Sequence, residues 1–203
     1  MAAMTVSFWK RRKFLTYLGL GTVAASATGI APPIIRSLSG GAMGLQSSTV
    51  GLPTAIATAS TTRLPDFEGI SQWLNSPPLT VPALQGKVVL VQFWTFSCIN
   101  CIRTLPYVVR WHQQYAPQGL VVVGVHTPEF GFERQASNVQ RALQEHRITY
   151  AVPLDNDYKT WKAYRNQYWP HLFLADRQGV LRYDHIGEGA YDRTEQVIRQ
   201  LLS

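Results

Sequence analysis

Cysteine is almost absent from this sequence, and its scarcity excludes several kinds of protein. The 203 residues contain two cysteines, so no network of disulfides can hold the fold together. A closed structural zinc site needs four ligands, and the five histidines show no paired spacing that would complete one. We therefore expect no metal site, and a hydrophobic core that holds the fold by itself.

Charged residues are also few, at 15% of the chain, whereas hydrophobic residues make up 46%. This composition is typical of a packed domain rather than of a disordered chain. The net charge is +7, but the basic cluster at 10–13 accounts for much of it, in a segment without acids. Because no basic stripe is interleaved with aromatic residues elsewhere, we expect no nucleic-acid partner.

Residues 1–27 have the layout of an export signal. The cluster KRRK precedes a moderately apolar run rich in Gly, Ala and Thr, and a small-x-small cleavage site ends at Ala27. The adjacent Arg11 and Arg12 resemble a twin-arginine translocation signal. We expect an extracytoplasmic protein, which residues 14–35 would anchor to a membrane if the segment stays uncleaved. The alternative is a basic tail on a cytosolic protein.

Composition divides the rest of the chain into two parts. Residues 28–62 are rich in Gly, Ser, Thr, Ala and Pro, which predicts a flexible linker. Residues 63–203 alternate between apolar runs typical of buried strands and segments of helical periodicity. The predicted strands are 87–94, 119–126, 150–155, 171–176 and 180–187, and the predicted helices are about 98–115, 132–146, 158–167 and 191–202.

This order predicts an α/β domain with a mixed central sheet and helices on both faces. The runs at 87–94 and 119–126 are continuously apolar, as in strands buried on both faces of a parallel sheet. The crossover rule makes these two strands parallel and adjacent, or nearly so. A short turn between 171–176 and 180–187 predicts an antiparallel hairpin.

Both cysteines, Cys98 and Cys101, stand where the first strand gives way to a helix. Unpaired N–H groups and the helix dipole favour an anion at that point, and a helix N-terminus lowers the pKa of a thiol. Cys101 follows one turn later on the same side, where it can form a disulfide with Cys98. We therefore predict thiol–disulfide exchange, with Cys98 as the nucleophile and Cys101 as the resolving thiol. Their redox-active disulfide would need no further cofactor.

Two other interpretations of the pair stay open. The cysteines could be two buried hydrophobic residues, although that predicts neither the strand–helix boundary nor Pro106 in the helix. A thiol-dependent peroxidase is the stronger alternative. Peroxiredoxins resemble this segment in having a Thr three residues before the reactive cysteine, where Thr95 stands. Their pattern also has Pro four residues earlier, where this chain has Val91.

Four stretches in order resemble the thioredoxin superfamily: WTFSCINCIRTLPY, GVHTPEFGFE, YWPHLFLADRQG and IGEGAYDRTEQVIRQLL. Within it they are similar to the TlpA-like group, and there to the thioredoxin-like domain of DipZ-type proteins, over most of residues 84–203. The resemblance implies a thioredoxin-like fold and extracytoplasmic exchange with protein thiol or disulfide substrates, or else a non-catalytic module of this fold. It also implies an upstream redox partner, which a membrane could hold. We expect a monomer.

The resemblance assigns roles to further residues. Pro170 is the expected cis-proline opposite the cysteines, and Trp169 would offer its backbone to an extended substrate segment. Pro106 would kink the active-site helix. Trp94 would pack against the disulfide and shield it.

Two departures from the family concern the proton acceptor for the second cysteine. Thioredoxins carry a buried acid six residues before the first cysteine, where Gln92 stands, and some TlpA-like reductases have Glu where Thr104 stands. Glu129 and His126 follow the C-terminal end of a strand, the edge at which α/β active sites gather. We expect Glu129 to replace the missing base, with His126 as the second candidate. Glu133 is expected to be an ordinary acid early in a helix.

Overall fold

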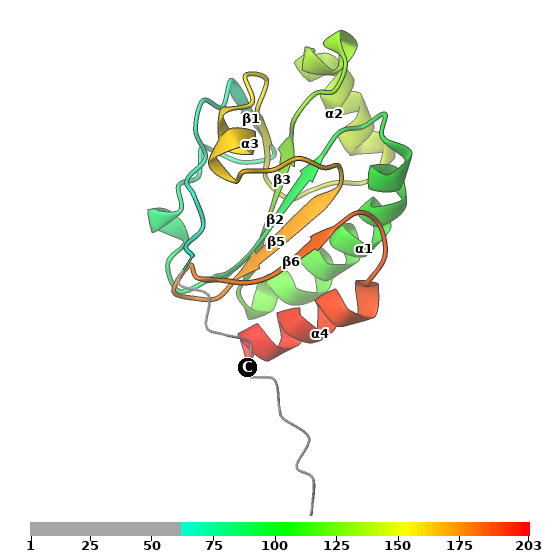
Figure 1. Ribbon diagram of the computed structural model, residues 1–203. Helices are drawn as coiled ribbons and strands as arrows, with labels where there is room; N and C mark the ends of the chain where they lie inside the picture. Colours follow the sequence, from blue (N-terminus) through cyan, green and yellow to red (C-terminus); the bar gives the residue numbers. More distant parts are fainter. Residues whose placement is uncertain (1–61) are drawn as a thin grey trace, which may run out of the picture. The chain divides into compact units, whose positions relative to one another are not determined.

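The computed structural model describes residues 62–203, which form one mixed sheet with helices on both of its faces (Figure 1). The strands are β1 (Gln72–Leu74), β2 (Val88–Trp94), β3 (Leu120–His126), β4 (Val152–Leu154), β5 (His171–Ala175) and β6 (Leu181–Ile186). The helices are α1 (Ile99–Tyr115), α2 (Ala136–Glu145), α3 (Lys159–Ala163) and α4 (Tyr191–Leu202), with short 3-10 turns η1 (Pro82–Leu84), η2 (Ala116–Gln118) and η3 (Gly131–Arg134). The predicted export signal, and the predicted linker up to residue 61, lie outside the described residues.

The strand order is β1-β4-β3-β2-β5-β6. β2, β3 and β4 run parallel, whereas β1, β5 and β6 are antiparallel to the strands they pair with. This confirms the mixed sheet, the parallel neighbours β2 and β3, and the hairpin β5–β6. Strand β1 was not predicted, because its three residues show no periodicity and are held by pairing with β4.

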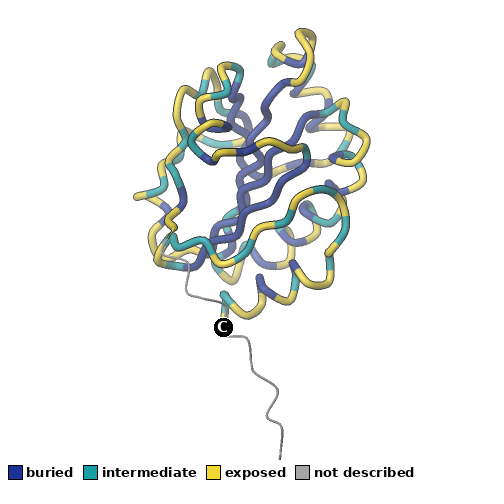
Figure 2. The backbone as a smooth tube through the Cα atoms, viewed as in Figure 1, coloured by how far each residue is buried: buried dark blue, intermediate teal, exposed yellow. Residues whose placement is uncertain are grey.

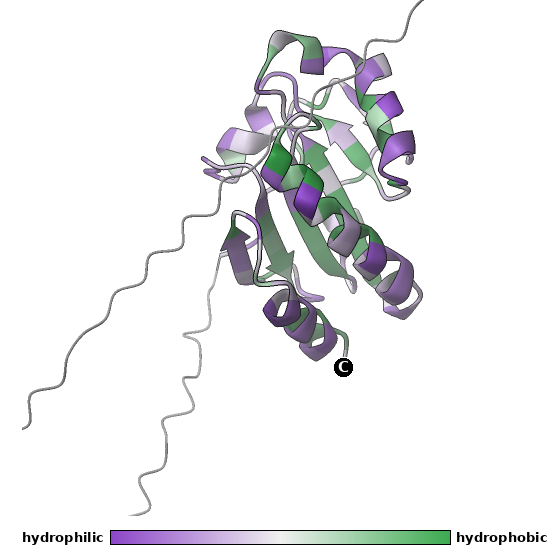
Figure 3. Cartoon of the chain, turned by 90° about the vertical axis from the view of Figure 1, so that its right-hand side faces the viewer, coloured by the Kyte–Doolittle hydropathy of each residue, from purple (hydrophilic) through white to green (hydrophobic). Residues whose placement is uncertain are grey.

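The core lies on both faces of the sheet. Leu90 and Trp94 of β2 belong to a cluster with side chains of α1, α2 and α4. Val89, Val91 and Phe93 alternate with them and join a second cluster with side chains of α3 and η1. Every residue of β2 is buried, as the dark central strands of Figure 2 show. Figure 3 shows hydrophobic strands at the centre of the domain, and helices around them along which hydrophilic and hydrophobic residues alternate.

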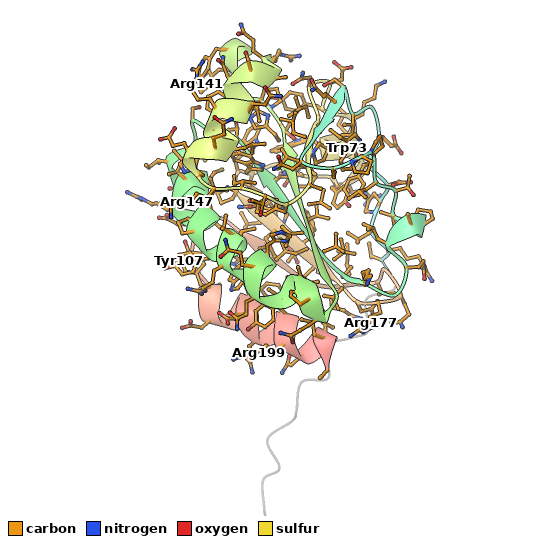
Figure 4. All side chains as sticks on the ribbon, turned by 180° about the vertical axis from the view of Figure 1, so that it is seen from behind. Trp73, Tyr107, Arg141, Arg147, Arg177 and Arg199 are labelled. Carbon is orange, nitrogen blue, oxygen red and sulfur yellow. The ribbon has the colours of Figure 1, made fainter. Side chains whose placement is uncertain are left out.

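Helix α4 packs against α1, the helix that begins at the cysteine pair. Glu195 of α4 accepts hydrogen bonds from the Tyr115 hydroxyl at 2.8 Å and the Trp111 indole at 3.2 Å, both on α1. The ring of Tyr107, labelled in Figure 4, stacks on Tyr191 of α4 with centroids 3.5 Å apart. These contacts join α1 to α4 from Tyr107 to Tyr115. Within residues 62–203, no helix has the length and apolar character needed to cross a membrane.

Candidate active site

The pairing of the strands brings three loops together at one edge of the sheet. β2 and β3 are parallel, with Trp94 opposite His126, so the segments that follow these residues leave the sheet side by side. β5 runs the other way, with His171 opposite Phe93, so the residue before His171 also lies at this edge. That residue is Pro170, and the Trp169–Pro170 peptide bond is cis, as predicted.

Cys98 is the N-cap of α1. Its backbone is extended, and its sulfur accepts a hydrogen bond from the backbone N–H of Cys101 at 3.4 Å, as a capping Ser or Asp oxygen would. The Cys98 sulfur also lies 3.9 Å from the backbone oxygen of Trp169. The side-chain hydrogen bond from Cys101, helped by backbone N–H groups, lowers the pKa of Cys98 to about 6 despite partial burial. The half-buried Cys98 is therefore largely a thiolate at neutral pH.

Cys101 differs from Cys98 in every respect that matters for exchange. It is buried, with no exposed surface, and it packs in the same cluster as Trp94. Burial raises the pKa of Cys101 well above its usual value, and the hydrogen bond to Cys98 acts in the same direction. Both cysteines are free thiols in this structure. The pair thus combines an accessible, acidic thiol with a protected one that keeps its proton.

Beneath the cysteines lie three buried side chains that contact one another: Trp94, Thr95 and His126. The Trp94 indole donates to the backbone oxygen of Gly124 at 3.1 Å, and its ring meets the His126 ring edge to face. The Thr95 hydroxyl lies 3.3 Å from Nε2 of His126. Burial lowers the pKa of His126 to about 4, so this imidazole is neutral at pH 7. Phe96 stacks on its other side.

The two acids of the loop after β3 differ in exposure. Glu129 is exposed, although its charge still acts to raise the pKa of Cys98. Glu133 is wholly buried and accepts hydrogen bonds from Ser97 and from the backbone of its own loop. Glu133 does lie in the first turn of a short helix, η3, as expected, but its burial corrects the expectation that it is an ordinary acid. No capping box marks Glu133 in the sequence, because the N-cap of η3 is Phe130, whose side chain has no acceptor.

Neither departure from the thioredoxin pattern introduces an ionisable group. Gln92 is buried, and neither polar atom of its amide has a hydrogen-bond partner among the described residues. Thr104 donates to the backbone oxygen of Asn100, one turn earlier in α1. Pro106 lies inside α1, as expected, and cannot donate to the carbonyl of Ile102.

The segment around Pro170 is held by aromatic contacts. The Trp169 indole donates to the backbone oxygen of Thr127 at 3.1 Å, and its ring lies 4.2 Å from that of Trp161 on α3. These contacts fix the backbone of Trp169 opposite Cys98. The hydrogen bond to Thr127 also joins the loop after β3 to the loop before β5.

Exposed large hydrophobic side chains surround this surface, and the sequence analysis did not single them out. Within residues 62–203 there are five of them, each about half exposed: Ile99, Phe130, Phe132, Tyr168 and Ile186. Ile99 follows the first cysteine, Tyr168 precedes Trp169, and the Phe130 and Phe132 rings stack on each other in the loop of Glu133. An apolar rim beside a reactive thiol is suited to contact with another protein. No three His, Cys, Asp or Glu side chains of residues 62–203 are arranged to hold a metal ion.

The fold and the two cysteines at the start of α1 define a thioredoxin-like protein. The AhpC/TSA family model matches residues 61–184, and the chain belongs to this family, within the thioredoxin superfamily. Protein DipZ of Mycobacterium tuberculosis is 49% identical over 142 residues, which cover 68% of this chain and 20% of DipZ. The chain thus matches about a fifth of the length of that relative.

Two relatives that the chain matches over nearly their whole length also have the thioredoxin-like fold or name. Thiol-disulfide oxidoreductase YkuV of Bacillus subtilis is 28% identical over 140 residues, covering 69% of this chain and 94% of YkuV. The crystal structure of a thioredoxin-like superfamily protein superposes with a TM-score of 0.65 at 28% identity. That match covers 70% of this chain and 96% of the other.

Proposed function

We propose that this chain is an extracytoplasmic thiol–disulfide oxidoreductase that exchanges disulfides with protein substrates through Cys98 and Cys101. The observation that carries the proposal is the Cys98 sulfur, which caps α1, has a low pKa and faces the backbone oxygen of Trp169. The relatives named DipZ and thiol-disulfide oxidoreductase YkuV support the same chemistry. The basic, weakly apolar N-terminal segment supports export.

In the reducing direction, the Cys98 thiolate attacks one sulfur of a substrate disulfide. The substrate S–S bond breaks, its other sulfur leaves as a thiolate, and a mixed disulfide forms through Cys98. Cys101 then loses its proton and attacks the Cys98 sulfur. The second substrate sulfur leaves, and the chain holds a Cys98–Cys101 disulfide. Two electrons have passed to the substrate, and the reverse sequence oxidises a substrate dithiol.

The buried position of Cys101 explains why the first step belongs to Cys98. A substrate sulfur can reach the half-buried Cys98, whereas Cys101 has no exposed surface. An extended substrate segment would lie along the backbone of Trp169, and its apolar side chains would contact the rim around the site. An upstream protein would restore the redox state of the pair, and the chain would act as a monomer.

The test is to trap the mixed disulfide. Cys101→Ser should accumulate a covalent complex between Cys98 and a protein disulfide substrate such as insulin, and dithiothreitol should release it. Cys98→Ser is the matched control and should trap nothing, because the buried Cys101 cannot be reached. Failure of the wild type to reduce insulin, together with no trapped complex, would favour a non-catalytic module of this fold.

The AhpC/TSA match and Thr95 keep a peroxidase as the second candidate. One observation weighs against it. The Thr95 hydroxyl lies 3.3 Å from Nε2 of His126 and makes no hydrogen bond to the Cys98 sulfur among those of residues 62–203. We expect slow oxidation of Cys98 by hydrogen peroxide. Fast, saturable oxidation with insulin left intact would decide for the peroxidase.

Export is tested separately. Arg11→Lys combined with Arg12→Lys should keep the protein in the cytoplasm if the twin-arginine route is used. Unchanged export of this double variant would point to another route.

A further inference from the structure

The carboxylate of Glu133 lies beside the cysteine pair and is not used in the exchange steps above. We propose that Glu133 is a positioning residue that holds the segment before Cys98, and that its fixed negative charge makes the Cys98–Cys101 pair more reducing. This inference rests on the proposed function, because it concerns the equilibrium of the same disulfide.

The carboxylate joins two segments that are distant in the sequence. One oxygen, Oε2, accepts the backbone N–H groups of Glu129 and Phe130 at 2.6 and 2.8 Å. The other, Oε1, accepts the Ser97 hydroxyl at 2.5 Å and the Ser97 N–H at 3.4 Å. Ser97 directly precedes Cys98, so Glu133 fixes the turn that places the reactive sulfur at the start of α1.

The charge of Glu133 is buried without a cationic partner. Its side chain has no exposed surface, and no salt bridge of residues 62–203 includes it. Burial acts to raise the pKa of Glu133, but hydrogen bonds from Ser97, Thr95 and the backbone outweigh burial and hold this pKa below its usual value. The carboxylate is therefore ionised at neutral pH, held by neutral donors that leave its charge uncompensated.

The titratable groups around Glu133 come from each element packed on it. They are Cys101 of α1, His126 of β3, Tyr158 before α3 and Glu129 of its own loop. His126 is neutral because burial lowers its pKa. None of these groups supplies a positive charge at pH 7. Arg134, the next residue, is exposed and donates to the backbone oxygen of Asn156, so solvent screens its charge and the field of the carboxylate acts on the cysteines.

This field acts differently on the two redox states. At pH 7 the disulfide is neutral, and its reduction by two electrons and one proton leaves a thiolate on Cys98 and a thiol on Cys101. A nearby negative charge disfavours the thiolate and therefore the reduced state. Burial, then the hydrogen bond and charge of Cys98, and last the charge of Glu133 all raise the pKa of Cys101, which keeps the negative charge on Cys98.

The experiment is the equilibrium of the full chain with glutathione at pH 7. Glu133→Gln removes the charge and nearly keeps the shape. We expect the equilibrium to move about tenfold toward the reduced state, which corresponds to a potential about 30 mV less negative. Glu133→Asp keeps the charge but shortens the reach. It should stay closer to wild type in potential while its thermal midpoint falls.

Glu129→Gln is the matched comparison, because it removes one charge from the same loop. The charge of Glu129 acts to raise the pKa of Cys98, but Glu129 is exposed, and solvent screens its charge. We expect a smaller shift than for Glu133→Gln. An equal or larger shift in Glu129→Gln would overturn the inference and favour Glu129. An unchanged potential in folded Glu133→Gln would also overturn it, as would equal shifts in the Gln and Asp variants of Glu133. A wild-type pair that never exchanges with glutathione would instead refute the proposed function.

Discussion

The reduction potential of the cysteine pair should change its dependence on pH at about pH 6. In the reduced protein, the pKa of Cys98 is lowered to about 6, whereas burial raises that of Cys101 far above neutrality. Below pH 6, reduction by two electrons takes up two protons. Between pH 6 and 8 it takes up one, because Cys98 stays a thiolate. The slope should therefore fall from about 60 to about 30 mV per pH unit.

The same pKa predicts how folding stability depends on pH. A thiol whose pKa is lower in the folded state than its usual value of 9.0 stabilises the reduced protein fully above pH 9. That contribution is lost as the pH falls through about 6. The oxidised protein has no such group. The urea midpoint of the reduced form, compared with that of the oxidised form, should therefore rise between pH 6 and 8.

Two measurements check this reasoning. Equilibration with dithiothreitol from pH 5 to 8 gives the slopes, and alkylation by iodoacetamide gives the pKa of Cys98 directly. Cys101→Ala should raise that pKa, because the Cys101 side chain is the largest cause of its lowering. Cys101→Ser keeps a donor and should raise the pKa less. A constant slope of about 60 mV per pH unit up to pH 8 would refute the assignment.

Other contacts predict losses of stability, each measured by urea unfolding. Glu195→Gln weakens the acceptor of the Tyr115 hydroxyl and should cost about 1–2 kcal/mol, with insulin reduction retained; no loss would show that α4 does not depend on this contact. Gly124→Ala should cost about 1–3 kcal/mol, because its methyl group would lie 2.7 Å from the Tyr150 ring; wild-type stability would mean that the ring moves aside. Asp155→Ala leaves two buried N–H groups at the start of α3 without their acceptor and should cost about 1–3 kcal/mol, whereas an unchanged midpoint would show that water replaces the carboxylate.

Most of the fold can be predicted from the sequence because its signals are local. β2 and β3 are continuous apolar runs, and their burial on both faces requires no other knowledge. The helix at 191–202 matches α4, because its apolar residues repeat at helical spacing. β1 was not predicted, because its three residues form a strand only through their pairing with β4. The predicted helix at 132–146 is instead two pieces, η3 and α2.

The site shows the same division. The spacing of Cys98 and Cys101 at a strand–helix boundary, with Pro170 ahead of a later strand, already indicates where exchange chemistry can occur. Tertiary structure alone decides which acid is buried beside the pair. Glu129 and Glu133 stand four residues apart in one loop, and the sequence analysis favoured Glu129, which is the exposed one. The carboxylate of Glu133 accepts a hydrogen bond from Ser97, 36 residues earlier in the chain. Such hydrogen bonds allow a carboxylate to be buried with its charge.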